Sequence, residues 1–292
     1  MPIKGYKAFK KDMTCRGFQF EEEQTYETDK AVICESGFHF CENPLDTLNY
    51  YNLCESEFAK VEALGETQTN DSDSKVCTTK IKIGAKLGIS GFVKASVDFL
   101  LEKCKKEGGE NDRILAASGY HSQLATSGDS SRLVASGDSS KLAASGYRSQ
   151  LAASGDSSKL AASGHSSRLM ASGDSSKLAA SGDCSQLATS GDCSQLAASG
   201  YYSQLMASGD CSRLMASGDS SQLEITGSNS VGAAIGINNR IKASLGCWIT
   251  LAEYKWDITY YKPICVKSAQ VDGEIIKANT WYKLVNGEFI ED

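Results

Sequence analysis

Residues 151–186 read LAASGDSSK LAASGHSSR LMASGDSSK LAASGDCSQ, which is one nine-residue unit repeated four times. The array extends in both directions, because Gly recurs every nine residues from Gly119 to Gly236 without a missed position. Leu recurs at the same interval from Leu115 to Leu223, and Ser lies three residues after most of the glycines. Most copies therefore follow the pattern L-[AVM]-[AT]-S-G-[DYH]-x-S-x.

This period predicts a stacked β-solenoid. Nine residues do not match the helical period over several turns, and Gly and Ser at this frequency disfavour a helix. In a stack of parallel coils the leucines form an inward column, the small side chains let the sheets approach closely, and each coil pairs with the next about 4.8 Å away. Gly would let the backbone turn, and a positive φ is one way to do so.

The number of units in a coil decides how many sheets the solenoid has. Two units make an 18-residue coil and three make a 27-residue coil. The bulky residues after Leu favour 18, since Val134, Met170 and Met206 are separated by multiples of 18. The turn position disagrees, because Tyr120 and Tyr147 are 27 residues apart. We predict an 18-residue, two-sided coil.

The repeats divide the chain into three parts. Residues 111–240 form the predicted solenoid, residues 1–110 carry both helix and strand signals, and residues 241–292 read as strands. We therefore predict a mainly β protein with an N-terminal α+β domain, a parallel β-solenoid of nonapeptide repeats and a small antiparallel β cap at the C-terminus. A long helix is expected over residues 90–107.

Three dipeptides predict local structure in the two flanks. Asn43–Pro44 has the residue types of an N-cap and a first helical residue, so a short helix should begin there. Asp272–Gly273 and Asn286–Gly287 are strong hairpin-turn signals and should each join two strands of the cap.

Composition excludes several classes of function. The net charge is −6 and the chain has no run of five or more basic residues, so we expect no nucleic-acid partner. No apolar run approaches the roughly 18 residues of a membrane span, and the N-terminus lacks the apolar stretch of a signal peptide. The 11 cysteines have no paired spacing, which favours free thiols in a reducing compartment. We expect a cytoplasmic protein with no membrane contact.

Catalytic and cofactor motifs are missing from the sequence: no phosphate-binding glycine loop, zinc-protease motif or nucleophile elbow occurs in it. The repeat differs from the calcium-binding nonapeptide, because Ser131 lies two residues before Leu133 where that repeat has Asp. One cluster has the residue types of a zinc site, namely Cys34, His39, Cys41 and Cys54. Its spacing matches no zinc motif, so we expect buried thiols beside a strand histidine. We predict no metal, no cofactor and no catalytic residues.

Four phrases in the two flanks carry a family resemblance. GYKAF, CRGFQF and CESGFHFCENPLDTLNYY near the N-terminus, with VDGEIIKANTWYKL near the C-terminus, resemble an uncharacterised family encoded by bacteriophages and prophages. Members of that family enclose a Gly/Ser-rich short repeat between the same two flanks. The resemblance implies a phage-linked protein in the cytoplasm of a bacterial host cell, and it implies no activity.

SGFHFCENPLDTLNYY also resembles the strand–helix segment of ADP-ribosyltransferases. That resemblance implies that Arg16 takes the first-strand position, where it would grip the nicotinamide ribose, and that Glu62 is the candidate carboxylate. The sequence departs from the pattern in two ways: the first motif has no His, and Tyr50 and Glu62 are close together. An ADP-ribosyltransferase-like N-terminal domain displayed on a solenoid is therefore an alternative.

The outer columns of the solenoid favour binding. Asp, Lys and Arg are nearly balanced there, and we expect them to form interleaved surface pairs. Four tyrosines stand out against the small residues around them, and tyrosines are enriched at protein interfaces. The candidate partner-binding residues are Tyr120, Tyr147, Tyr201 and Tyr202.

The sequence thus predicts a non-enzymatic protein-binding or scaffolding protein. The partner is another protein or a second copy of the chain, so a homo-oligomer is one expected form. With the phage resemblance, inhibition of a host or defence protein is the expected role. A structural or carbohydrate-binding virion component is a further alternative.

Overall fold

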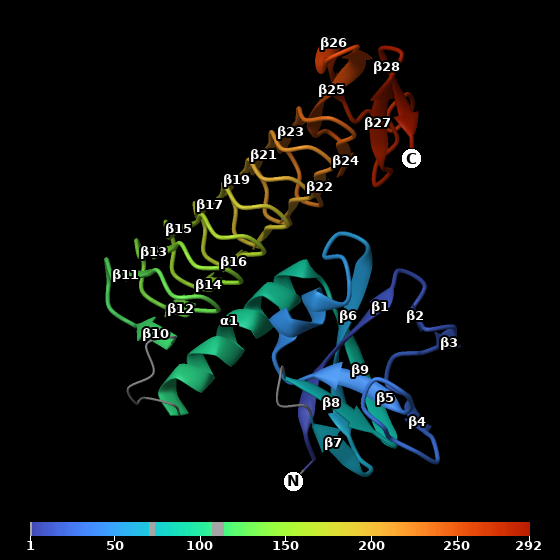
Figure 1. The fold of residues 1–292 in the computed structure, drawn as a ribbon, viewed down its shortest axis with the longest axis vertical. Helices are drawn as coiled ribbons and strands as arrows, with labels where there is room; N and C mark the ends of the chain where they lie inside the picture. The colour runs from blue at the N-terminus through green and yellow to red at the C-terminus, as the bar shows by residue number, and fades with distance from the viewer. Residues whose placement is uncertain (1, 70–73, 107–113) are drawn as a thin grey trace. The chain divides into compact units, whose positions relative to one another are not determined.

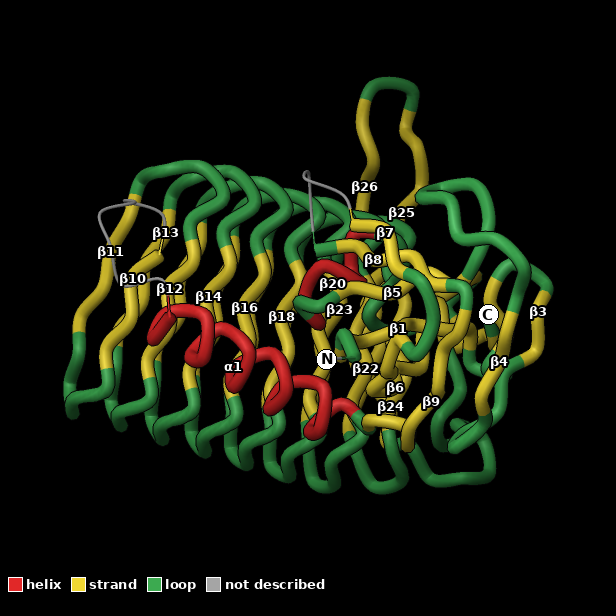
Figure 2. The backbone as a smooth tube through the Cα atoms, turned by 90° about the horizontal axis from the view of Figure 1, so that it is seen from below, coloured by secondary structure: helices red, strands yellow, loops and turns green. Residues whose placement is uncertain are grey.

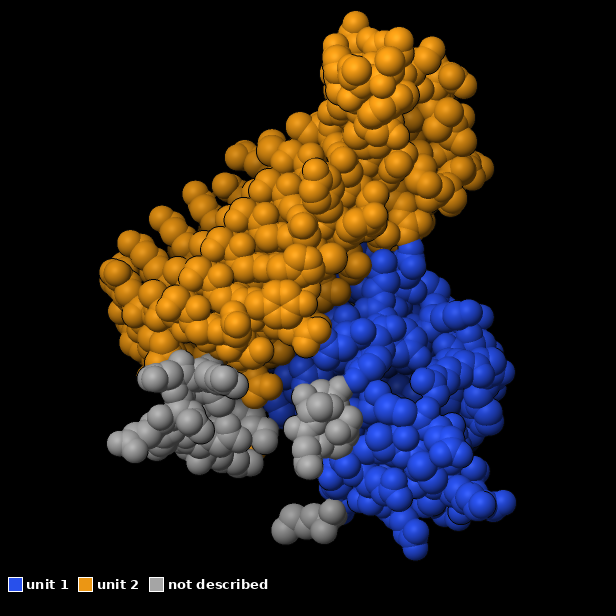
Figure 3. All heavy atoms as spheres, viewed as in Figure 1, with its two compact units in different colours: residues 1–99 blue, residues 100–292 orange. Residues whose placement is uncertain are grey.

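The computed structural model describes residues 2–69, 74–106 and 114–292. They form two compact units, residues 1–99 and 100–292, which Figure 3 colours separately. Strands dominate both units, as predicted (Figure 1). The helix predicted over residues 90–107 is α1 (Ile89–Lys106), which contains the boundary between the units.

A seven-stranded antiparallel sheet is the framework of the first unit. The strand order is β4-β9-β6-β1-β5-β8-β7, so β1 lies at the centre between β6 and β5. A short separate hairpin, β2–β3, follows β1 in the chain. The strands are β1 (Lys4–Lys10), β2 (Thr14–Cys15), β3 (Phe18–Gln19), β4 (Thr25–Glu27), β5 (Phe38–Cys41), β6 (Ser56–Ala63), β7 (Thr67–Thr69), β8 (Lys75–Thr78) and β9 (Lys80–Leu87).

The core of this unit is built from apolar residues on several strands. Phe9 on β1, Phe40 on β5 and Ile83 on β9 are buried together in one cluster. The predicted short helix is the 3-10 helix η1 (Pro44–Asn49), and it begins as predicted. The Asn43 side-chain oxygen accepts a hydrogen bond of 3.1 Å from the Leu45 N–H, so it satisfies one of the donors left open at a helix start.

The repeats of the second unit form a parallel β-solenoid (Figure 2). Its first sheet contains β10 (Ile114–Ala117), β12 (Arg132–Ala135), β14 (Gln150–Ala153), β16 (Arg168–Ala171), β18 (Gln186–Thr189), β20 (Gln204–Ala207), β22 (Gln222–Ile225) and β24 (Arg240–Ala243). Its second sheet contains β11 (Gln123–Thr126), β13 (Lys141–Ala144), β15 (Lys159–Ala162), β17 (Lys177–Ala180), β19 (Gln195–Ala198), β21 (Arg213–Ala216) and β23 (Val231–Ala234).

Strand register confirms the 18-residue coil. Leu133 on β12 pairs with Leu151 on β14, and the same offset of two repeats holds along both sheets. The 27-residue alternative is wrong. Met215 also follows a repeat leucine but is 45 residues from Met170, which is not a multiple of 18; it lies on the second sheet, whereas Met170 lies on the first.

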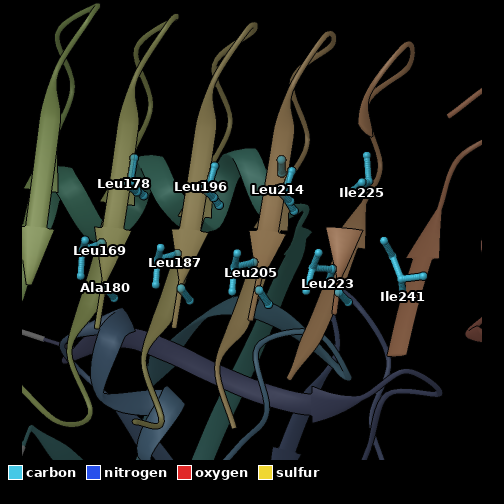
Figure 4. Close-up of a cluster of buried hydrophobic side chains, with 14 of the residues drawn as sticks. Leu169, Leu178, Ala180, Leu187, Leu196, Leu205, Leu214, Leu223, Ile225 and Ile241 are labelled. Atoms are coloured by element: carbon cyan, nitrogen blue, oxygen red, sulfur yellow. The ribbon is translucent and has the colours of Figure 1, made fainter. Parts of the chain in front are cut away.

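The leucines point inward, as the repeat predicted (Figure 4). Leu169 and Leu187 on the first sheet face the interior together with Leu178 and Leu196 on the second sheet, and all four are at most 2% exposed. Each buried Leu contributes about 2 kcal/mol. The small side chains between the leucines allow the two sheets to pack as one continuous core.

Glycine is required in the repeat for a reason other than the one predicted. The ladder glycines do not have positive φ; the left-handed residue lies two positions later, as at Ser157 with φ 56°. A Cβ atom built on Gly155 would lie 2.4 Å from the carbonyl carbon and oxygen of Gly137 in the neighbouring coil. Hydrogen is therefore the one side chain that fits where successive turns stack.

Four more strands end the chain: β25 (Trp248–Asp257), β26 (Tyr260–Gln270), β27 (Tyr282–Val285) and β28 (Glu288–Glu291). β25 pairs in parallel with β23 and antiparallel with β26, and β27 pairs antiparallel with β24 and β28. Asn286–Gly287 is the tight turn between β27 and β28, as predicted, and both residues have positive φ.

The second turn prediction in this region is wrong. Asp272–Gly273 lies in an irregular segment between β26 and β27 and does not join a hairpin. The Asp272 carboxylate accepts hydrogen bonds of 2.9–3.0 Å from the N–H groups of Glu274, Ile275 and Ile276. Local side-chain bonding therefore overrides the hairpin signal.

Among the described residues, no helix combines the length and hydropathy needed to cross a bilayer.

Candidate functional site

Aspartates in the solenoid turns bind the next coil. The Asp138 carboxylate accepts the backbone N–H of Asp156 at 3.0 Å, and Asp156 accepts that of Asp174 at 2.9 Å. These residues lie in the turns after the strands of the first sheet, which we call the first corner. The second corner comprises the turns after the second sheet, where Asp129 and Asp183 do the same. The acidic residues are thus coil-to-coil ladders, which the expectation of interleaved surface pairs missed.

Three of the four predicted tyrosines share the second corner. Tyr147 and Tyr201 replace the ladder aspartate there, and Tyr202 occupies the adjacent left-handed position with φ 56°. Tyr120 replaces the ladder aspartate in the first corner. All four side chains are 42–77% exposed. The structure therefore groups Tyr147, Tyr201 and Tyr202, which we call the tyrosine corner, and separates Tyr120 from them.

The aromatic substitutions remove a stabilising contact. A tyrosine has no carboxylate to accept the N–H of the next coil, so each replacement gives up a charged hydrogen bond that the aspartates make. Part of the loss is offset by stacking: the Tyr147 and His165 rings are 5.5 Å apart with an interplanar angle of 17°. The Arg148 guanidinium lies 5.0 Å from the centre of the Tyr147 ring.

A shallow groove of about 870 Å³ runs along the outer face of the second sheet. We call it the alanine groove, because Ala143, Ala161 and Ala179 lie in its floor with Ser145 and Ser163 beside them. Each of these serines lies two residues before a residue of the second corner, so the groove borders the tyrosine corner.

The other border of the groove is basic. Lys141, Lys159 and Lys177 lie on the same strands two residues before the alanines, and alternate residues of a strand share a face. Arg213 continues this column. The groove therefore lies between a row of cations and the second corner, where aromatic residues are interspersed with ladder aspartates.

The β25–β26 hairpin exposes an unusual number of large apolar side chains. It projects from the end of the solenoid in Figure 2. Ile258 at its turn is 87% exposed, and Trp256, Tyr260, Ile264 and Val266 are also exposed. We call these five residues the apolar arm. Its strands were predicted, whereas this degree of exposure was not.

A second cavity lies within the first unit and has a volume of about 460 Å³. Its walls come from β1, β5, β8, the β2–β3 hairpin and the residues that follow η1. The side chains that line it are unusually rich in aromatic rings and cations. The cations are Lys7, Arg16 and Lys75, and the aromatic residues are Tyr6, Phe18, Phe20, Phe38, Phe40, Tyr50 and Tyr51.

Lys7 is the buried cation of this cavity. Its side chain is on the central strand β1, and the residue is only 5% exposed. The ammonium donates a hydrogen bond of 2.8 Å to the His39 carbonyl oxygen and lies 3.5 Å from the Cys15 Sγ atom. Burial lowers the pKa of Lys7, and the neighbouring Cys15 partly opposes that change.

Cys15 and Tyr51 extend the polar network. The Cys15 Sγ and the Tyr51 hydroxyl are 2.8 Å apart. Burial, followed by the hydrogen bond to Cys15, raises the pKa of Tyr51, so this phenol remains protonated at neutral pH. Neither residue was singled out from the sequence. In CRGFQF and LNYY, polar and aromatic residues occur side by side. This combination is the sequence signal that could have pointed to Cys15 and Tyr51.

In the predicted cysteine–histidine cluster Cys41 and Cys54 are buried and His39 is on β5, as expected, whereas Cys34 is exposed. The Nε2 atom of His39 accepts a hydrogen bond of 3.0 Å from the Cys34 N–H. Burial and the nearby cations Lys7, Arg16 and Lys75 lower the pKa of His39, so the ring is neutral. In the parts of the chain that the structure describes, no group of three or more potential ligands could hold a metal ion.

The two residues implied by the ADP-ribosyltransferase resemblance lie in different places. Arg16 is in the turn of the β2–β3 hairpin and lines the cavity. Glu62 is on β6, where it pairs in register with Lys4 and Lys82, and it is not among the side chains that line the cavity. The structure does not bring this pair together in one cavity.

Comparison with known proteins adds one finding. Residues 3–95 match a family described as a domain of unknown function (DUF7666), and this segment includes every residue of the cavity in the first unit. No curated protein and no solved structure matches the chain at a significant level. The match assigns no activity to the cavity.

Proposed function

We propose that this protein binds another protein through the tyrosine corner and the alanine groove beside it. The observation that carries the proposal is the replacement of ladder aspartates by exposed tyrosines in one corner. These rings occupy positions where a carboxylate would bind the next coil, so coil stability does not account for them. Exposed tyrosines beside a flat groove are the residue type that anchors protein interfaces.

The partner should present an acidic, extended surface. Lys141, Lys159 and Lys177 form a row of positive charge along one side of the groove, and the alanine floor leaves room for a backbone or small side chains. With the family resemblance of the flanks, we propose a host or defence protein in the cytoplasm of a bacterial cell as the partner. The solenoid acts as a rigid scaffold and carries out no reaction.

The test uses the full chain with a tag and a matched control. Wild type, the triple variant Tyr147→Ala/Tyr201→Ala/Tyr202→Ala and the single variant Tyr120→Ala are each used to capture proteins from a bacterial lysate. We expect an acidic protein to bind wild type and Tyr120→Ala and to be lost from the triple variant. Arg16→Ala and Glu62→Ala should leave its binding unchanged. Equal capture by wild type and the triple variant would refute the proposal.

The apolar arm favours self-association as a second form of protein binding. Several large side chains exposed on one projecting hairpin, with Ile258 at 87%, are typical of a surface that a partner covers. We propose that a second copy of the chain covers it. Ile258→Asp with Trp256→Ser should shift the protein toward the monomer in analytical ultracentrifugation. Ile275→Asp, which changes an equally exposed isoleucine outside the arm, should not.

The virion alternative makes a different prediction. A structural or carbohydrate-binding component would be present in purified phage particles, whereas a cytoplasmic inhibitor would be found in the infected cell and be missing from the particles. Mass spectrometry of both fractions distinguishes the two roles.

A further inference from the structure

The 460 Å³ cavity of the first unit has the chemistry of a binding site for a small anion. Its one acidic lining residue is Glu27, and the Glu27 carboxylate already forms an ion pair of 2.9 Å with Lys80. Two of the lining cations, Lys7 and Arg16, form no ion pair with a carboxylate among the described residues. A volume of this size is within the usual range for small-molecule sites.

Lys7 is the strongest reason to expect an anion. A lysine this deeply buried is rarely found without a charged partner. The described contacts of its ammonium are a neutral carbonyl, the Cys15 sulfur and the faces of the Phe9 and Phe20 rings, at 5.6 and 5.3 Å. Among the described residues no carboxylate lies within ion-pair distance of it. Burial lowers the pKa of Lys7, and an anion in the cavity would oppose that change.

Arg16 is held in a strained conformation at the same cavity. It and Gly17 have φ values of 51° and 80°, the positive values of a type I′ hairpin turn. Asn is favoured at this first turn position, and a long side chain such as Arg is disfavoured there. No partner for the Arg16 guanidinium occurs in the described part of the chain.

The aromatic residues add a second recognition element. Phe18 on the hairpin and Tyr50 after η1 line the cavity with their rings about half exposed, and the Lys75 ammonium lies 4.0 Å from the centre of the Tyr50 ring. Rings of this kind bind flat groups by stacking. The two positive charges of Lys7 and Arg16 match a phosphate monoester, which carries close to two negative charges, better than a single carboxylate.

We propose that this cavity binds the phosphate monoester of a planar ring compound, such as a nucleoside monophosphate. Lys7 and Arg16 contact the phosphate, and Phe18 and Tyr50 contact the ring. The proposal concerns the first unit alone and is independent of protein binding by the solenoid. No chemical step is required, because the site recognises its ligand by charge and stacking.

Isothermal titration calorimetry on the full chain tests this site, with adenosine monophosphate as the probe. Adenosine and inorganic phosphate represent its two halves. We expect the monophosphate to bind wild type, and each half to bind at least about tenfold more weakly, since each lacks one set of contacts. The proposal is overturned if the monophosphate does not bind, or if either half binds as tightly as the whole.

Variants separate binding from folding. Arg16→Asn removes the guanidinium and introduces the residue that the turn favours, so the melting temperature should rise while affinity for adenosine monophosphate falls about tenfold or more. Lys7→Met should also reduce affinity, and Lys10→Met, which removes an exposed cation from the same strand, should not. Wild-type affinity in Arg16→Asn would rule out the assigned role even if Lys7→Met fails to fold.

Discussion

The Oδ1 atom of Asp183 accepts a hydrogen bond of 2.8 Å from the backbone N–H of Tyr201, one coil further along the solenoid. This contact ties two coils together at their corner. Asp183→Ala removes the acceptor and should destabilise the protein by about 1–2 kcal/mol, as measured by urea denaturation. Asp183→Asn keeps an oxygen acceptor and should cost less. Equal losses for Ala and Asn would show that the hydrogen bond does not account for the effect.

Tyr201→Asp should separate stability from binding. The new carboxylate would lie one coil before Asp219. It could accept the backbone N–H of Asp219, as each ladder aspartate accepts the N–H of the residue one coil later. An uninterrupted run of aspartates, from Asp138 to Asp210, already stacks in the first corner, so one more is tolerated. We expect a gain of up to about 1 kcal/mol in unfolding free energy together with weaker partner binding.

Tyr202→Ser is the matched control for that experiment. Tyr202 is exposed in the same corner but lies outside the ladder column, and Ser is the commonest residue of the other repeats at this left-handed position, so its replacement should weaken binding without the stability gain of a new ladder bond. A stability gain of the same size in both variants would contradict the ladder explanation.

Gly173→Ala should be among the most destabilising changes in the repeats. A Cβ atom there would lie 2.4 Å from the backbone of Gly155 in the preceding coil, so the coils would have to separate locally. We expect a loss of about 2–3 kcal/mol, measured by thermal or urea unfolding. At Gly119 the closest atom to a new Cβ is the Ser122 hydroxyl at 3.6 Å, an ordinary contact. Gly119→Ala should therefore be nearly neutral, and a similar loss at both glycines would argue against stacking as the cause.

Acid should weaken the contact between Asp210 and Ser228 in the first corner. Hydrogen bonds from the Ser228 backbone and side chain hold the pKa of Asp210 below its usual value. Because the folded-state pKa is the lower one, this stabilisation is present above the unfolded-state pKa, about 3.9, and is lost as the pH falls through the folded-state value. Melting temperatures measured between about pH 6 and pH 2 should fall less steeply for Asp210→Asn than for wild type. Parallel curves would show that this carboxylate does not contribute.

Incubation with labelled NAD should leave no label on the protein or on lysate proteins. The physical reason is the separation of Arg16, which lines the cavity of the first unit, from Glu62 on β6, which does not. Autoradiography of the reaction checks the result, with Glu62→Gln as the companion sample. Labelling by wild type that Glu62→Gln abolishes would establish the transferase alternative.

The local signals that succeeded are those with a direct steric or hydrogen-bonding cause. Asn43 caps η1 because its side chain accepts the N–H of a residue two positions later. Asn286–Gly287 forms the predicted hairpin because both residues adopt the positive φ that the turn requires. Asp272–Gly273 failed because the Asp272 carboxylate found three N–H donors just beyond it. The preference of Asp-Gly for a hairpin turn depends on those two residues alone, so it does not take into account hydrogen bonds from the carboxylate to residues further along the chain.

The candidate sites were harder to foresee. Tyr147, Tyr201 and Tyr202 were evident as unusual residues, but a linear sequence treats Tyr120 as their equal, and only the two-corner geometry separates it. The cavity of the first unit joins Lys7, Arg16, Tyr51 and Lys75, which come from four separate segments. Their meeting depends on antiparallel pairings between distant strands, which periodicity does not reveal.

The sequence by itself determined the solenoid, its inward leucine column and its small-residue spacing, because a repeat imposes the same contacts at every coil. The tertiary structure decided which outer columns face the groove, why Gly must lie where coils touch, and that a buried lysine meets a strained arginine at one cavity. A strict repeat makes the neighbour of each residue predictable. In the first unit no such repetition exists, so neighbours are decided only when the whole sheet has formed.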